Sequence, residues 1–145
     1  MSNIHTIYCI VAVDHDKKQN FVLSTNTEEI QFPIVQVEHP KFLYNEIRYH
    51  FANFFLKETY NPEIIRGIGF SYTDIQNELI IKYIDDKVKE LDTNNDLFML
   101  CGGVIEKTYI LNNNFSWNAF EFSKSFDNTD LTISLIDFII GKSIL

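Results

Sequence analysis

The stretch Lys41-Phe-Leu-Tyr-Asn-Glu-Ile-Arg-Tyr-His-Phe-Ala-Asn-Phe-Phe-Leu-Lys57 decides the fold, because its apolar residues recur at spacings of three and four. This spacing places them on one face of an α-helix. Pro40 stands just before the stretch, where its fixed φ suits a first helical turn. We therefore predict an amphipathic helix from Lys41 to Glu58. The residues of this apolar face are Leu43, Ile47, Phe51, Phe54 and Phe55, and the helix is expected to pack through the first four.

Extended segments lead into this helix. Residues 4–13 form a nearly continuous apolar run, which is typical of a central strand that is covered on both faces. A polar turn over residues 14–20 connects this run to a second strand over residues 21–25. A third extended segment, over residues 30–37, passes through Phe32-Pro33 and reaches the helix.

This order of a strand, a hairpin, a strand, a Phe-Pro pair and a helix resembles the Nudix fold. In that family the strand ends in Leu-Pro-Gly-Gly, and the helix that follows carries Arg-Glu-x-x-Glu-Glu. The glutamates of that helix hold magnesium against a nucleoside diphosphate linkage. The resemblance implies an α+β domain with a Nudix-like mixed β-sheet sandwiched between helices, and residues 1–145 would form this single domain.

The chain departs from the family at the charged positions of the motif. In a gapless comparison from Phe32-Pro33, the two glycines, the loop glutamate, the arginine and the three helix glutamates fall on Ile34, Val35, Lys41, Tyr49, His50, Asn53 and Phe54. Magnesium requires oxygen ligands in near-octahedral geometry, and carboxylates usually supply them. The resemblance therefore implies that the usual metal site is absent, and we expect no metal and no other cofactor.

These losses favour a non-catalytic structural or interaction module that is a subunit of a larger protein assembly. The alternative is a divergent Nudix-type hydrolase of nucleoside diphosphate linkages. Its polar residues would be Glu38, Glu46, His50 and Asn53, and the last three share one edge of the helix. A third hypothesis is a small-ligand sensor that uses the emptied cleft.

The second half of the chain is predicted to contain further strands and a helix. Residues 64–72 favour a strand interrupted by Gly67 and Gly69. Residues 73–92 favour a helix that would be an insertion in the simplest Nudix layout, and a strand over residues 78–84 is the competing interpretation. Three further strands are expected over residues 97–105, 108–111 and 115–122.

A last helix is expected from Thr129 to Ile140, with Gly141 as its stop. Apolar residues cover more than one of its faces. In one interpretation, the core of the domain itself buries this helix on several sides. In the other, the extra face docks another subunit, because large exposed apolar patches mark interfaces. The residues of this predicted interface are Ile133, Ile136, Ile140, Ile144 and Leu145.

Two other patterns could carry chemistry. Asp14-His15-Asp16 contains metal-ligand side chains, but adjacent residues in a turn are more typical of a solvated hairpin tip. Cys9 and Cys101 each lie in an apolar run. We therefore expect buried thiols rather than a nucleophile, a zinc site or a disulfide.

The composition disfavours two classes of partner. The net charge is −8, and the basic pairs at 17–18 and 87/89 stand among acidic residues, so direct nucleic-acid binding is not expected. No apolar run reaches the roughly 18 residues of a membrane span, and residues 1–5 do not resemble a signal peptide. We expect a cytoplasmic protein. Abundant Phe, Ile and Asn are typical of AT-rich genomes, which suggests a virus or phage component and then a place in the virion.

Overall fold

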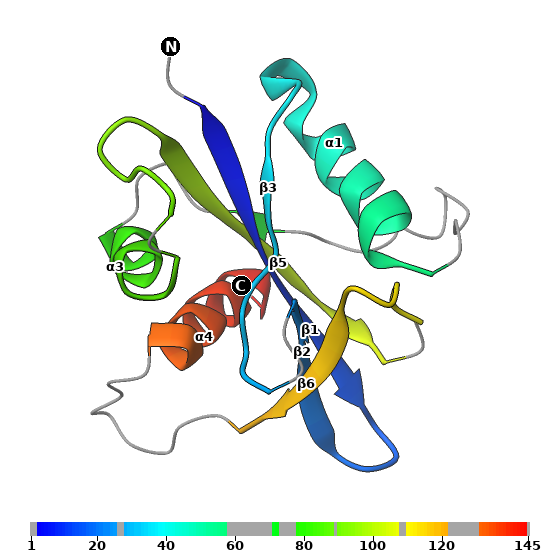
Figure 1. Cartoon of the computed structure of the whole chain (residues 1–145). Helices are drawn as coiled ribbons and strands as arrows, with labels where there is room; N and C mark the ends of the chain where they lie inside the picture. The colour runs from blue at the N-terminus through cyan, green and yellow to red at the C-terminus, as the bar shows by residue number, and fades with distance from the viewer. Residues whose placement is uncertain are drawn as a thin grey trace.

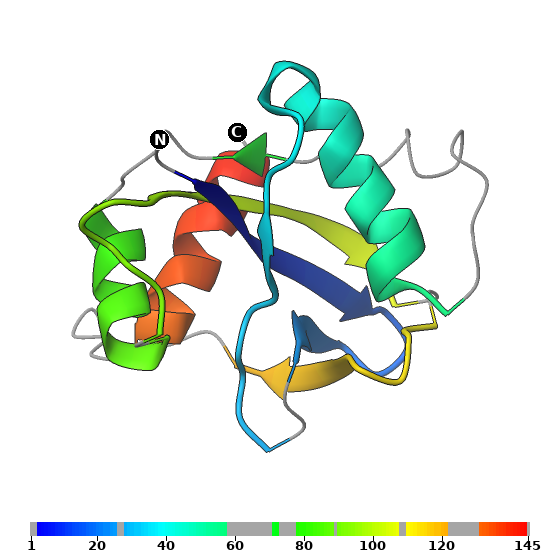
Figure 2. The same ribbon diagram turned by 45° about the horizontal axis from the view of Figure 1, so that its top comes forward.

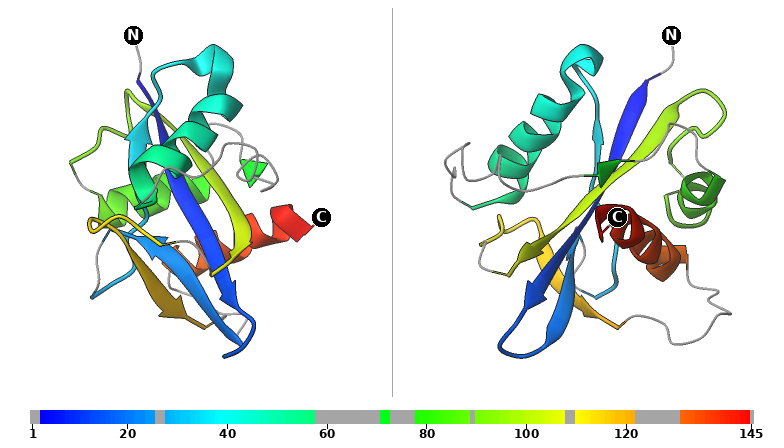
Figure 3. Two further views of the ribbon diagram at one scale, coloured as in Figure 1. Left: turned by 90° about the vertical axis from the view of Figure 1, so that its right-hand side faces the viewer. Right: turned by 180° about the vertical axis from the view of Figure 1, so that it is seen from behind.

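The computed structural model describes residues 3–25, 28–57, 71–72, 78–88, 90–107, 110–121 and 131–144. These residues form a mixed α+β structure in which a curled, mostly antiparallel sheet lies between helices (Figure 1). Helix α1 (Leu43–His50) lies on one side of the sheet. Helices α3 (Glu78–Lys87) and α4 (Leu131–Ile144) lie on the other side (Figures 2 and 3). The predicted α+β class is thereby confirmed.

Strand β1 (Ile4–Asp14) is the centre of the sheet and pairs with three other strands. It runs parallel to β5 (Leu97–Glu106) along almost its whole length. On its other edge it pairs antiparallel with β3 (Ile34–Gln36) near its start and with β2 (Gln19–Ser24) near its end. The uninterrupted apolar run at residues 4–13 therefore does form the central strand.

Two more strands extend the sheet at its ends. β4 (Ser71–Tyr72) pairs antiparallel with β5, and β6 (Ser116–Phe120) pairs antiparallel with β2. The path through the sheet is β4-β5-β1-β2-β6, with β3 on β1 beside it. In the parallel pair, Tyr8 lies opposite Cys101. The strands predicted over residues 97–105 and 115–122 correspond to β5 and β6.

Alternate side chains of β1 enter two hydrophobic clusters, one on each face of the sheet. The cluster under α1 receives Tyr8, Ile10 and Ala12. The cluster under α3 and α4 receives Ile7, Cys9 and Val11. All six residues are at most 1% exposed, so the strand has no solvated face and its sequence has no polar alternation.

Helix α1 follows a 3-10 turn, Pro40–Phe42, and continues into a π-helical turn, Phe51–Phe55. A π-helix bonds each residue to the fifth along the chain, so successive side chains advance by a smaller angle than in an α-helix. Phe55 is consequently buried. Phe54, which we predicted in the core, is 42% exposed, and that prediction is wrong. The other predicted contacts do lie in or against the core: Leu43, Ile47 and Phe51.

Helix α4 packs on the sheet beside α3. Leu135, Ile136 and Ile139 are fully buried in this contact. Gly102 of β5 permits the close approach, because a Cβ atom there would meet the carbonyl oxygen of Cys9 and lie 2.6 Å from the side chain of Ile139. No helix in the described part of the chain has both the length and the hydropathy needed to cross a bilayer.

Several predicted boundaries change in the structure. α3 confirms the helical interpretation of residues 78–87 against the strand. α4 continues past Gly141 to Ile144, so the predicted stop is wrong; the backbone of Gly141 does not adopt the positive φ of a helix-ending glycine. Gly67 and Gly69 lie outside the described residues. The segment predicted as a strand over 108–111 is described only at its end, where Leu111 forms a bridge with Leu56.

Candidate functional site

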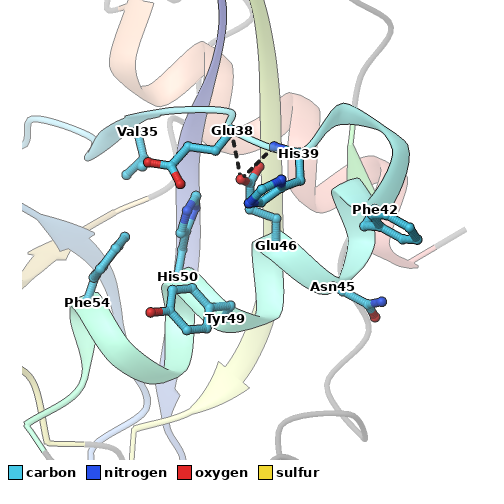
Figure 4. Close-up of a pocket in the computed structure, with 9 residues that line it drawn as sticks. All are labelled: Val35, Glu38, His39, Phe42, Asn45, Glu46, Tyr49, His50 and Phe54. Carbon is cyan, nitrogen blue, oxygen red and sulfur yellow. Dashed lines mark hydrogen bonds between the residues drawn. The ribbon is translucent and has the colours of Figure 1, made fainter.

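A cleft of about 770 Å³ lies between α1 and the segment that joins β3 to this helix (Figure 4). Three of the four residues that would serve a divergent hydrolase line it: Glu38, Glu46 and His50. The fourth, Asn53, is exposed, and its side-chain amide donates to the carbonyl oxygen of Tyr49 at 3.0 Å. The other lining residues are Val35, His39, Phe42, Asn45, Tyr49 and Phe54.

Glu46 fixes the loop that forms the roof of the cleft. Its Oε1 accepts hydrogen bonds from the backbone N–H groups of Glu38 at 2.8 Å and His39 at 3.1 Å. Glu46 is only 8% exposed, and its Oε2 has no hydrogen-bond partner among the described residues. One oxygen of this carboxyl group is therefore hydrogen-bonded to the loop, and the other is buried without a partner among the described residues.

His50 lies one helical turn after Glu46 and contacts the central strand of the sheet. Its Nδ1 is hydrogen-bonded to the hydroxyl of Tyr8 at 2.6 Å. Burial lowers the pKa of His50 below the ordinary value, against smaller opposite effects of Glu46 and Glu38. Burial also raises the pKa of Tyr8, with smaller contributions from Cys101 and Glu46. At neutral pH the pair is therefore an uncharged phenol and an uncharged imidazole.

Aromatic rings form the exposed wall of the cleft. Phe42, Tyr49 and Phe54 are 64%, 56% and 42% exposed. The ring of Phe54 stacks on His50 with centroids 5.0 Å apart, and Tyr49 meets Phe54 edge to face at 5.7 Å. This wall was not predicted, because the helical spacing placed Phe54 in the core and indicated no role for Phe42. The available signal was the recurrence of aromatic residues at positions 42, 49 and 54.

The positions of the Nudix glutamates offer no carboxylate here. Lys41 is exposed in the 3-10 turn. His50 bonds to Tyr8, Asn53 bonds to the backbone of its own helix, and Phe54 stacks on His50. Within the described ranges, no group of three or more His, Cys, Asp or Glu side chains is arranged to hold a metal ion. The cleft can thus offer hydrogen bonds, aromatic faces and two carboxylates.

The other candidate residues lie elsewhere and have structural roles. Oδ1 of Asp14 accepts the backbone N–H groups of Asp16 and Lys17, as expected of a hairpin tip. Cys9 and Cys101 are free and fully buried in opposite faces of the sheet. Burial raises the pKa of both thiols, which disfavours the reactive thiolate.

The C-terminal helix divides its predicted interface residues between core and surface. Ile136 is fully buried in the core of the domain, so it is not available to another subunit in this structure. Ile133 and Ile140 are partly buried and pack against the same cluster. The side chains of Ile144 and Leu145 lie outside the described set. Ile136 is therefore buried within its own domain, and an interface formed by the other residues stays a prediction.

Comparisons with known proteins give no relative from which a function could be transferred: no family model matches the chain, and no curated protein or solved structure matches it significantly. The chemistry of the cleft between β3 and α1 is therefore the basis for the functional assignment.

Proposed function

We propose that the chain is a Nudix-like domain without the catalytic magnesium site, which serves as a non-catalytic interaction module in a larger protein assembly. The fold supports this proposal through the order of its elements. A central strand is followed by a hairpin, a short strand after Phe32-Pro33, and a helix that covers one face of a mixed sheet. A C-terminal helix covers the other face.

The main evidence against a catalytic metal site is the pair of hydrogen bonds that Glu46 accepts. This residue is the only carboxylate that α1 contributes to the cleft, and both bonds to its Oε1 come from the roof loop. A magnesium ion would find only the second, buried oxygen of Glu46 without a hydrogen bond, and no further carboxylate on the described part of α1. Glu46 is therefore best explained as a cap for the loop.

The observation that favours a binding role is the aromatic wall. Phe42, Tyr49 and Phe54 expose apolar surface on one side of α1, next to polar residues of the cleft. Large aromatic residues surrounded by polar ones are enriched in protein–protein interfaces. We infer that partner subunits contact the domain at this wall, in addition to the surface predicted on α4. A virus or phage particle stays a prediction for the identity of the assembly.

The divergent hydrolase is the alternative, because Glu38, Glu46 and His50 do line one cleft. It is tested by incubating the domain with a panel of nucleoside diphosphate compounds in the presence of magnesium or manganese. We expect no turnover above that of the buffer. Metal-dependent turnover that Glu46→Gln abolishes and that Glu121→Gln, an exposed substitution outside the cleft, leaves intact would establish the hydrolase and overturn the proposal.

The assembly is tested in the native source. An extract of cells or particles that contain the protein is separated by size under non-denaturing conditions, and the chain is followed with an antibody. We expect it to elute far above the size of a 145-residue monomer. If all of the chain elutes at the size of a monomer, it does not belong to a larger assembly and the proposal is contradicted.

A further inference from the structure

The buried oxygen in the cleft has no partner. Oε2 of Glu46 is not hydrogen-bonded by any described residue, although the side chain is more than nine-tenths buried. A buried carboxylate oxygen without a donor is costly, because it has lost its hydration and gained nothing in return. Figure 4 shows the carboxyl group of Glu46 directed toward the backbone of Glu38 and His39, at the inner end of the cleft. The site therefore favours an occupant that brings hydrogen-bond donors.

The electrostatics of the cleft favour a cation. Glu38 adds a second, more exposed carboxylate, and both carboxylates act on His50. The described lining includes neither lysine nor arginine, and the nearest basic residues along the chain, Lys41 and Arg48, are not part of it. The net charge of −8 adds a long-range attraction for positive partners. A neutral His50 does not oppose this attraction.

The aromatic wall indicates which kind of cation the cleft favours. Phe42, Tyr49 and Phe54 line the same cleft as the two carboxylates, with Phe42 and Phe54 at opposite ends of it in Figure 4. Rings of this kind attract cations, and the planar guanidinium group stacks on them while it donates paired hydrogen bonds to a carboxylate. An open cleft of about 770 Å³ is also far larger than one small ion and leaves room for the residues that flank a side chain.

We propose that this cleft binds an arginine side chain presented by a protein partner, and this inference rests on the proposed interaction function. The guanidinium group donates to the carboxylates of Glu38 and Glu46 and packs against the aromatic wall beside His50. The flanking residues of the partner lie along Phe42. The site thus selects partners by a single exposed arginine.

The binding test is an amide NMR titration of the ¹⁵N-labelled domain with N-acetyl-arginine amide. The control ligand is N-acetyl-citrulline amide, which has the same shape and no charge. We expect saturable shifts in the millimolar range around Glu38, Glu46, Tyr49 and His50 with arginine, and none with citrulline. Equal binding of both ligands, shifts at another surface, or no saturable shift with arginine would each overturn the proposal.

Variants of exposed residues separate charge from stacking. Glu38→Gln and Tyr49→Ser should each weaken arginine binding by about threefold or more. Glu121→Gln removes the same unit of charge at an exposed position outside the cleft and should leave binding unchanged. The amide spectra of the three variants report whether they remain folded. Unchanged binding in a folded Glu38→Gln variant would contradict the assigned contact.

Two further ligands test whether the cation belongs to a protein partner or to a free small molecule. A short peptide with arginine between apolar residues should bind more tightly than the capped amino acid, because its neighbours contact the cleft as well. Agmatine, a free small cation, should bind no more tightly than the capped amino acid. Tighter binding of agmatine than of the peptide would assign the site to a small molecule and overturn the protein partner. If the domain does not bind arginine but the chain elutes in a large assembly, only the arginine inference is refuted. If the domain binds arginine but the chain elutes as a monomer, the proposed membership of an assembly is refuted.

Discussion

The hydroxyl of Tyr8, on the central strand, lies 2.6 Å from Nδ1 of His50, on the helix that lines the cleft. Both side chains are at most 4% exposed, so each polar atom finds its partner in the other and not in water. The rings also meet edge to face, with centroids 5.9 Å apart. This contact anchors the polar edge of α1 to the middle of the sheet.

Removal of the Tyr8 hydroxyl tests this anchor. Tyr8→Phe leaves Nδ1 of His50 buried without a partner, which should lower the free energy of unfolding by about 1–3 kcal/mol. Urea denaturation measures the change. Tyr49→Phe removes a hydroxyl from an exposed ring and should change stability by less than about 0.5 kcal/mol. Equal effects of the two substitutions would show that the bond to His50 contributes nothing.

The stability of the domain should depend on pH through His50. Burial lowers the pKa of this residue in the folded state below the ordinary value of 6.5. As the pH falls, the unfolded state therefore takes up a proton before the folded state does. The free energy of unfolding consequently decreases below about pH 6.5. Above that pH the contribution is complete.

This pH effect is measured as the change in the free energy of unfolding between about pH 7.5 and about pH 5.5. His50→Gln keeps a hydrogen-bonding group near Tyr8 but cannot titrate, so its loss of stability over this interval should be smaller than that of the wild type. Identical losses in both chains would mean that His50 is not the group responsible.

A pair of glycine substitutions tests the packing of α4. Gly102→Ala places a methyl group against the carbonyl oxygen of Cys9 and the side chain of Ile139, and should cost about 1–3 kcal/mol. Gly141→Ala meets no atom within 4 Å and should stabilise the helix by up to about 1 kcal/mol. Thermal or urea denaturation of both variants gives the comparison. A neutral Gly102→Ala would contradict the close approach of α4 to β5.

Two phenylalanines of one helix should behave in opposite ways. Phe51 is fully buried, so Phe51→Ala should cost about 3–5 kcal/mol through the cavity it leaves. Phe54 is 42% exposed, so Phe54→Ala should cost less than about 1 kcal/mol. Comparable losses for the two variants would indicate that the helix remains α-helical through Phe55 and buries Phe54.

Much of the fold could be predicted from hydrophobic periodicity. The run at residues 4–13 predicts a strand buried on both faces, and the spacing of Leu43, Ile47 and Phe51 predicts the buried face of α1. Phe54 and Phe55 were both predicted on that face. The exposure of Phe54 could not be predicted, because a π-helical turn changes the angle between side chains and has no simple sequence signal. The continuation of α4 past Gly141 depends on tertiary packing, which overrides the weak helix propensity of glycine.

The cleft was predictable only in part. Helical spacing brings Glu46 and His50 to one edge, and both do line the cleft. Their bonds to the roof loop and to Tyr8 involve partners that are separated by 7 to 42 positions in the chain. Periodicity within one helix carries no information about such partners. For the same reason, the sequence did not indicate that Oε2 of Glu46 would be buried without a donor.

The role of Glu46 as a loop cap, and not as a metal ligand, is tested most directly by calorimetric titration of magnesium into the wild-type domain and into Glu46→Gln. We predict that millimolar magnesium produces no binding heat that differs between the two proteins. Saturable sub-millimolar binding to the wild type that Glu46→Gln abolishes would contradict the account and restore a magnesium site to this cleft.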